Sequence, residues 1–142
     1  EAYSVTAAIT GGSTESKTVS MIDGAGTFTL TTGQDNIVGA TGDDTIIGNS
    51  ENNELYGKDG DDYIVGGKGE DYLLGGEGND TLVFDENDKN ISGGNGLDTL
   101  LVFNETVLSF DKIVDSIEIL EMRGSFRTTC NANTWRCIKN DG

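Results

Sequence analysis

A nine-residue repeat constrains the fold of this chain more than any other feature of its sequence. From Leu30 to Leu101 the register holds through eight units without an insertion. With Gly66 taken as position one, position eight of every unit is aliphatic: Ile37, Ile46, Leu55, Ile64, Leu73, Leu82, Ile91 and Leu100. A unit this short holds one strand and one turn and cannot bury an apolar face alone, so the units must stack. The sequence therefore predicts a solenoid whose core is a single seam of Ile and Leu.

The other positions of the unit predict its local structure. Positions seven to nine, such as YLL at 72–74, suit a three-residue strand whose central side chain points inward. The glycines before them suit a turn with positive φ and close backbone approach. Position four is Gly in six units, and position six is Asp in six units: Asp35, Asp44, Asp62, Asp71, Asp80 and Asp98. Asn53 and Lys89 replace this Asp in the two units that also lose the position-four Gly.

The repeated Gly and Asp residues predict a calcium site. Calcium takes six to eight oxygen ligands and accepts both carboxylates and main-chain carbonyls. Glycine lets the carbonyls of a loop converge, and the Asp at position six brings a carboxylate to the same loop. One loop supplies too few ligands, so the site is expected between two stacked loops. A solvated acidic face is the alternative, but it does not require a glycine beside each Asp.

The repeat resembles a known family. GGKGEDYLL at 66–74 and GGEGNDTLV at 75–83 resemble the nonapeptide GGxGxDxUx, with U aliphatic, of RTX (hemolysin-type) calcium-binding proteins. The resemblance covers residues 30–101 and implies an all-β fold, a parallel β-roll (a right-handed β-helix-like solenoid) with two units per turn and calcium between the loops of successive turns. It also implies type I secretion without a cleaved N-terminal signal, and folding when the chain meets external calcium.

Two units per turn would place alternate units above one another, which separates the candidate ligands into two edges. One edge carries Asp44, Asp62, Asp80 and Asp98 and is expected to hold about three calcium ions. The other edge carries Asp35, Asn53, Asp71 and Lys89 and is expected to hold fewer, because Asn lacks the charge and Lys offers no acceptor. The interval between Asp71 and Lys89 is expected to be empty, or rebuilt by Asp85 and Asp88. The glycines assigned to the metal loops are Gly42, Gly57, Gly60, Gly67, Gly69, Gly76, Gly78, Gly94 and Gly96.

Charge and composition exclude several classes of function. The chain has 25 Asp and Glu against 9 Lys and Arg, a net charge of -16, and most of this charge lies in the repeats. Such a field repels phosphate backbones and anionic lipids, so neither nucleic acid nor a membrane is an expected partner. No apolar run approaches the roughly 18 residues of a membrane span. The chain has no His, which removes Ser-His-Asp and Cys-His catalysis, and no enzyme activity is expected.

The segments on either side of the repeat differ from it. We expect an N-terminal β cap over 1–29, with strands in YSVTAAI, KTVSMI and TFTL, the RTX roll over 30–101, and a C-terminal cap and tail over 102–142. Residues 109–122 are predicted to mix a helical turn with a strand. Cys130 and Cys137 allow a disulfide in an oxidising setting or two free thiols. The first residues, EAYSVTAAIT, lack the basic region and apolar run of a secretory signal, and we expect the chain to be a piece of a longer protein.

A second resemblance concerns the role of the whole protein. Residues 28–48, FTLTTGQDNIVGATGDDTIIG, resemble stretches of secreted RTX surface proteins, including bacterial S-layer proteins and large adhesins. This implies a calcium-stiffened structural segment, extracellular or on the bacterial cell surface, in which calcium can join copies of the protein to itself or to other surface proteins. The competing interpretation is the export and folding module of a secreted RTX enzyme or toxin, such as a lipase or protease.

Overall fold

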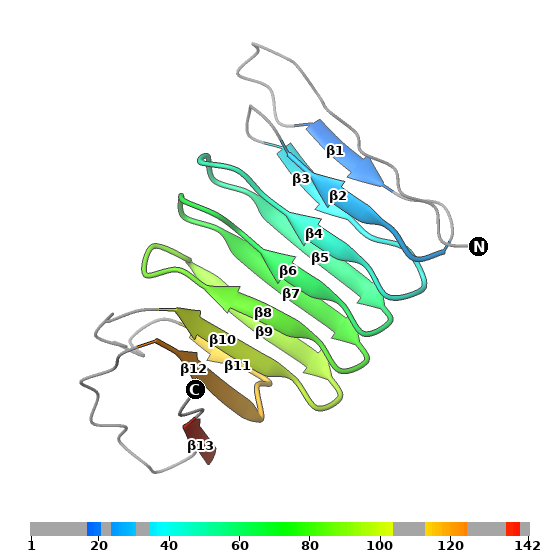
Figure 1. Ribbon diagram of the computed structural model, residues 1–142. Helices are drawn as coiled ribbons and strands as arrows, with labels where there is room; N and C mark the ends of the chain where they lie inside the picture. Colours follow the sequence, from blue (N-terminus) through cyan, green and yellow to red (C-terminus); the bar gives the residue numbers. More distant parts are fainter. Residues whose placement is uncertain (1–16, 21–23, 31–34, 104–112, 125–135, 140–142) are drawn as a thin grey trace.

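The computed structural model describes residues 17–20, 24–30, 35–103, 113–124 and 136–139 (Figure 1). Thirteen β-strands and no helix occur in these residues, and no element has the length and apolar character of a membrane-crossing helix. The strands are β1 (Lys17–Ser20), β2 (Thr27–Thr29), β3 (Asp35–Val38), β4 (Thr45–Ile47), β5 (Glu54–Asp59), β6 (Tyr63–Val65), β7 (Tyr72–Glu77), β8 (Thr81–Phe84), β9 (Asn90–Asn95), β10 (Thr99–Phe103), β11 (Ile113–Asp115), β12 (Ile119–Arg123) and β13 (Arg136–Lys139).

The strands alternate between two parallel sheets. One sheet has the order β1-β3-β5-β7-β9-β11, and the other has the order β13-β12-β10-β8-β6-β4-β2. Between strands of the repeat, paired residues lie 18 positions apart, as Leu55 and Leu73 do, and Ile46 and Ile64. Two nine-residue units therefore make one turn, and the turns stack side by side (Figure 1). The predicted parallel β-roll is confirmed.

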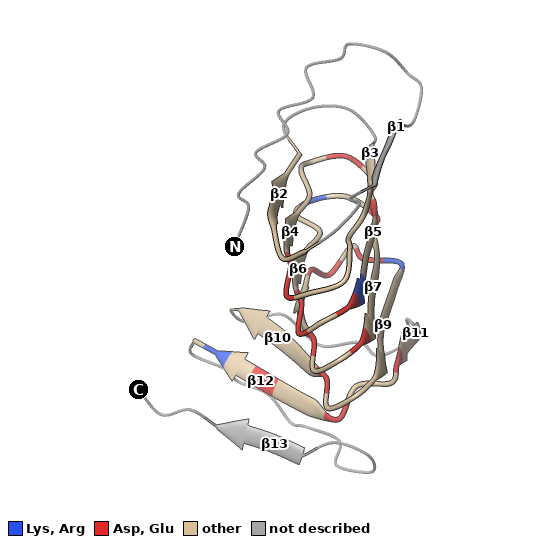
Figure 2. Ribbon diagram, turned by 90° about the vertical axis from the view of Figure 1, so that its right-hand side faces the viewer, with Lys and Arg blue, Asp and Glu red and all other residues tan. Residues whose placement is uncertain are grey.

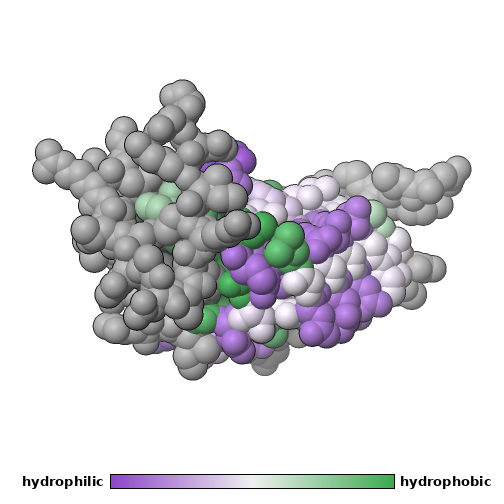
Figure 3. Space-filling view, turned by 90° about the horizontal axis from the view of Figure 1, so that it is seen from below, coloured by the Kyte–Doolittle hydropathy of each residue, from purple (hydrophilic) through white to green (hydrophobic). Residues whose placement is uncertain are grey.

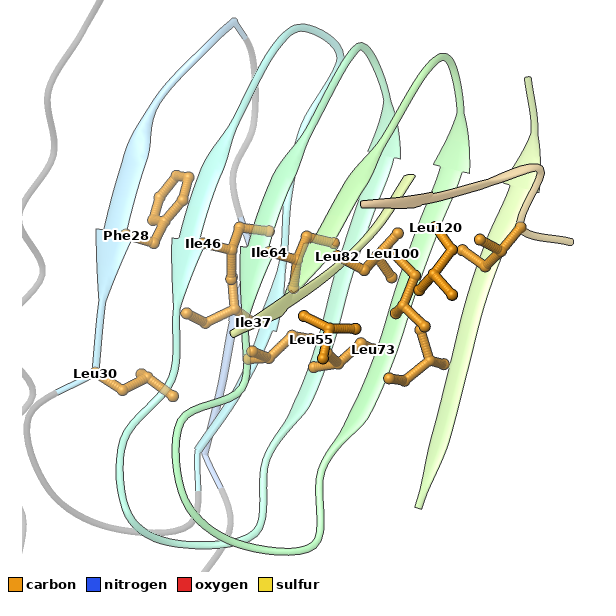
Figure 4. Close-up of a cluster of buried hydrophobic side chains, with 13 residues drawn as sticks. Phe28, Leu30, Ile37, Ile46, Leu55, Ile64, Leu73, Leu82, Leu100 and Leu120 are labelled. Atoms are coloured by element: carbon orange, nitrogen blue, oxygen red, sulfur yellow. The ribbon is translucent and has the colours of Figure 1, made fainter. Parts of the chain in front are cut away.

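The core lies between the two sheets and consists of the aliphatic seam (Figure 4). All eight side chains at position eight are at most 2% exposed, and Phe28 and Leu120 continue the row beyond the repeat. Each fully buried Leu or Ile contributes roughly 1.5–3 kcal/mol of transfer free energy. Because a short strand offers one such residue per unit, stability comes from contacts between successive turns.

Three strands of one sheet are twice as long as the three residues predicted from the repeat. β5, β7 and β9 have six residues, whereas β4 and β6 have three. The extra pairing involves positions two and three of the unit, as in Lys58↔Gly76 and Asp59↔Glu77. At Gly76, φ is +136° and a Cβ would collide with Lys58 O, so glycine allows the two main chains to approach this closely.

The sheets extend beyond the repeat at both ends. β1 and β2 pair with β3 and β4, and β11 and β12 pair with β9 and β10. The helical turn predicted in 109–122 is wrong for the described part, residues 113–122, which holds β11, a bend and the start of β12. The boundaries at 29 and 101 stay a prediction. Cys130 and the side chain of Cys137 lie outside the described residues, as does the predicted choice between disulfide and thiols.

Candidate metal centre

Position-six side chains form two buried columns, one along each edge where loops join the two sheets. Relative exposure along the first edge is 0–2%, for Asp44, Asp62, Asp80 and Asp98. Along the second edge Asn53 and Asp71 are equally buried, while the side chain of Asp35 lies outside the described residues. Figure 2 shows acidic residues recurring on the loops from turn to turn. Buried carboxylates are rare unless they have polar or metal partners, so the columns require an account of each oxygen.

The Oδ1 atoms are occupied by the main chain. Asp44 N–H donates to Asp62 Oδ1 at 2.7 Å, and Asp62 N–H donates to Asp80 Oδ1 at 2.8 Å. Asp80 N–H donates to Asp98 Oδ1 at 2.8 Å, and on the second edge Asn53 N–H donates to Asp71 Oδ1 at 2.8 Å. Each aspartate is therefore fixed by a donor one turn earlier, and the bond joins neighbouring turns.

The Oδ2 atoms of the same residues have no such partner. Oδ2 is buried without a hydrogen bond in four residues: Asp62, Asp71, Asp80 and Asp98. In Asp44 the equivalent oxygen is satisfied, because Ala40 N–H donates to Asp44 Oδ2 at 2.9 Å. A buried, ionised oxygen without a donor costs several kcal/mol unless a cation compensates it.

Main-chain carbonyls converge on these oxygens. A Cβ built on Gly57 would meet Asp62 Oδ2 and, at 2.9 Å, the carbonyl oxygen of Gly75. A Cβ on Gly75 would likewise collide with Asp80 Oδ2 and the carbonyl oxygen of Gly93. The missing side chain of position one thus lets a carboxylate oxygen and a carbonyl oxygen from the next turn face one point. These are the hard oxygen donors that calcium requires, and the residues fit the ion.

The electrostatics of the columns agree with this fit. Burial raises the pKa of Asp62 from 3.8 to about 7. The hydrogen bond from Asp44 N–H lowers this pKa, whereas the charges of Asp80 and Asp44 raise it. Burial also raises the pKa of Asp71 and of Asp80 to about 6, and it raises the pKa of Asp98. Without a cation, these carboxylates retain protons at pH values well above those at which an aspartate ordinarily ionises.

Carboxylates alone do not complete the site. Across the described ranges, no three Asp, Glu or Cys side chains come close enough together to hold a metal by themselves. Calcium with six to eight ligands would therefore depend on carbonyls of the loops, as the glycine content suggests. Most of the glycines predicted for the metal loops have positive φ: Gly42, Gly60, Gly67, Gly69, Gly76, Gly78, Gly94 and Gly96. Gly57 is the exception and serves through its missing Cβ.

The second edge changes at the irregular unit 84–92. Lys89 does not enter the column, because its Nζ lies 3.0 Å from Glu70 Oε1 and its side chain is half exposed. Asp88 is buried instead, at 1% exposure, and its Oδ2 accepts the Asp85 N–H at 2.7 Å. Ala40 N–H and Asp44 Oδ2 make the same bond between loop and side chain. The motif misses Asp88 because this aspartate stands at position five, one residue early, although the sequence DEND shows its acidic character.

The fold and the site together define a class: a parallel β-roll with oxygen-lined loops for calcium. Comparison with known families agrees. The model of the RTX calcium-binding nonapeptide repeat (4 copies) matches residues 29–58 and 47–82. Residues 29–82 thus match RTX repeats, as predicted, and the repeats of this family bind Ca²⁺. No curated protein and no solved structure shows a significant match to the chain.

Proposed function

We propose that this chain is a calcium-dependent structural domain of a type I secreted protein that lies outside the cell or on the bacterial cell surface, in the manner of an S-layer protein or adhesin. The buried column of unpartnered Oδ2 atoms facing glycine carbonyls supports this proposal most directly. About three calcium ions lie between the rungs Asp44, Asp62, Asp80 and Asp98. Fewer lie along the edge of Asp35, Asn53 and Asp71.

Calcium acts here as a folding switch. Successive rungs are one turn apart, roughly 4.8 Å in the direction of strand pairing, so ionised aspartates repel one another in the stacked state. An ion that binds only the stacked state adds RT ln(1 + [L]/Kd), or about 4 kcal/mol for three independent sites at tenfold excess. Extracellular calcium modules bind at about 10⁻⁴–10⁻³ M. Millimolar external calcium therefore folds the domain, and cytosolic calcium leaves it unfolded.

Circular dichroism tests the switch. We expect a disordered spectrum in EGTA and a β spectrum in 5–10 mM CaCl₂, about tenfold above a submillimolar Kd. Magnesium is the matched control cation, because it requires near-ideal octahedral geometry and gives up water reluctantly, so equal magnesium should leave the chain unfolded. A β spectrum in EGTA that calcium does not change contradicts the proposal.

The surface role needs a separate measurement. On part of the face in Figure 3, rows of hydrophilic side chains alternate with residues of intermediate hydropathy, and a group of hydrophobic side chains lies beside the grey residues, so contacts between copies through the rows would be polar. Acidic rows on two copies repel unless a divalent ion lies between them. If the domain assembles through such contacts, light scattering should show calcium-dependent growth in particle size after folding is complete. A particle size that stays that of the monomer at all calcium concentrations instead favours the export and folding module of a secreted enzyme or toxin.

A further inference from the structure

The coil that follows the repeat, residues 113–118, has no RTX motif but continues the column. β11 pairs in parallel with β9, so Asp115 lies beside Ser92. In the same register, Ser116 corresponds to Gly93 of the preceding turn. β12 pairs with β10 through Ile119↔Thr99, which places Glu118 beside Asp98. Positions two to five of the unit are replaced here by Ile117 alone. The coil is thus a shortened turn in register with the roll.

Glu118 stands next in the column, after Asp98. Asp98 N–H donates to Glu118 Oε2 at 2.9 Å, which repeats the bond from Asp80 N–H to Asp98 Oδ1. Main-chain hydrogen bonds are donated in the other direction, from the later turn to the earlier one: Glu118 N–H and Ile119 N–H donate to Asp98 O at 3.1 and 2.9 Å. A glutamate outside the motif therefore occupies the place of the next aspartate.

Ser116 supplies the carbonyl of this interval. A Cβ on Gly93 would collide with both Ser116 O and Asp98 Oδ2, as a Cβ on Gly75 would with Gly93 O and Asp80 Oδ2. Ser116 has φ +52°, a left-handed conformation that is uncommon for a residue with a side chain. Asp98 is 0% exposed and its Oδ2 has no hydrogen-bond partner. A buried carboxylate oxygen and a carbonyl oxygen thus face one point here, as they do between the motif turns.

We infer that this coil completes a further calcium site at the C-terminal end of the Asp44–Asp98 edge, held by Asp98, Glu118 and the carbonyl of Ser116. The inference rests on the proposed calcium function and adds a site beyond the three intervals of the repeat. A groove of about 400 Å³ lined by residues that include Gly93, Gly94 and Ser116 adjoins the interval, so water can supply ligands that the shortened loop lacks. The site therefore binds more weakly than its neighbours and fills last.

The first test counts calcium ions by native mass spectrometry and measures affinities by isothermal titration on the full chain. Glu118→Gln keeps an oxygen for the Asp98 N–H but removes the charge. We expect one ion to be lost, or its affinity to fall about tenfold or more, since charged ligands set calcium affinity. Glu121→Gln is the matched control on β12, where Glu121 pairs with Arg123 at 2.8 Å, and it should bind as the unchanged chain does. An unaltered count and affinity in Glu118→Gln overturns the inference.

The second test does not depend on how the variant folds. A crystal structure of the unchanged chain grown in calcium should show an ion about 2.3–2.6 Å from Asp98 Oδ2 and Ser116 O. Ions between Asp62 and Asp80 with none at Asp98 and Ser116 overturn this inference and leave the proposed function intact. The absence of ions at every interval overturns both.

Discussion

At the scale of single residues, each aspartate of the column divides its two oxygens between two tasks. In Asp62, Oδ1 holds the preceding turn through Asp44 N–H, while Oδ2 faces the carbonyl of Gly75 and has no donor. The first task needs only an acceptor, which asparagine also provides, whereas the second task needs charge. Asn53 brings no charge to the second edge, and its Oδ1 accepts the N–H of Asn49, in its own turn, at 3.0 Å.

Replacing Asp62 by Asn should therefore change the two states of the chain in opposite directions. In Asp62→Asn the calcium concentration at the midpoint of the dichroism transition should rise about tenfold or more, because one charged ligand is lost. In EGTA the same variant should have more β structure, because a buried charge is gone. Asp61→Asn is the control: Asp61 is exposed and accepts the Asn79 N–H at 2.7 Å, and its loss should move the midpoint less than twofold. Equal shifts in the two variants would mean that only net charge matters.

The sequence predicts these residues to different degrees. Asp44, Asp62, Asp80 and Asp98 follow from the period, since equal spacing in a solenoid becomes one column in space. Asp88 was named only as one of two residues that could rebuild the irregular interval, and its burial at position five, one residue early, does not follow from the period. Glu118 and Ser116 carry no motif at all. Their place depends on the pairing of β11 and β12 with the roll, which no local pattern specifies.

At the scale of elements, each strand is stabilised by its neighbours more than by its own sequence. β4 and β6 have only three residues, and one side chain of each enters the core. The register was predictable because a shift by one residue would exchange the buried position eight for an exposed neighbour. The six-residue length of β5, β7 and β9 was not, because it depends on glycines of adjacent turns approaching each other.

A pair of adjacent leucines on β7 tests this dependence. Leu73 is 0% exposed and pairs with Leu55 and Ile91, whereas Leu74 is 38% exposed. In saturating calcium, Leu73→Ala should lower the free energy of unfolding by about 2–5 kcal/mol, because it leaves a cavity in the seam. Leu74→Ala should cost under about 1 kcal/mol. Urea denaturation followed by dichroism measures both, and similar losses in the two variants would show that the seam does not carry the stability.

At the scale of the whole molecule, acid should stabilise the metal-free roll. The folded pKa of Asp62 is about 7, and those of Asp71 and Asp80 are about 6, all above the ordinary 3.8 that we take for the unfolded chain. The folded state therefore binds more protons than the unfolded state between about pH 4 and 7. Because the unfolded state then holds fewer protons, the free energy of unfolding falls as pH rises through this window.

Calcium reverses this dependence on pH, because the ion binds ionised carboxylates and competes with protons. In calcium-free buffer we expect more β structure at pH 5 than at pH 7.5. In a calcium titration we expect a lower midpoint at pH 7.5 than at pH 5.5. Dichroism at constant ionic strength measures both, and metal-free stability that rises with pH across the window would contradict the raised pKa values.

The stacking of the turns also has a mechanical consequence. At 18 residues per turn the 72 residues of the repeat correspond to four turns, so Leu30 and Leu101 lie under about 20 Å apart along the axis of stacking. As a flexible glycine-rich coil, the same 72 residues would span about 45 Å on average. Metal uptake therefore draws residue 30 toward residue 101 and shortens the segment by more than half. A tether built in this way would contract when it reaches calcium and could pull against a load.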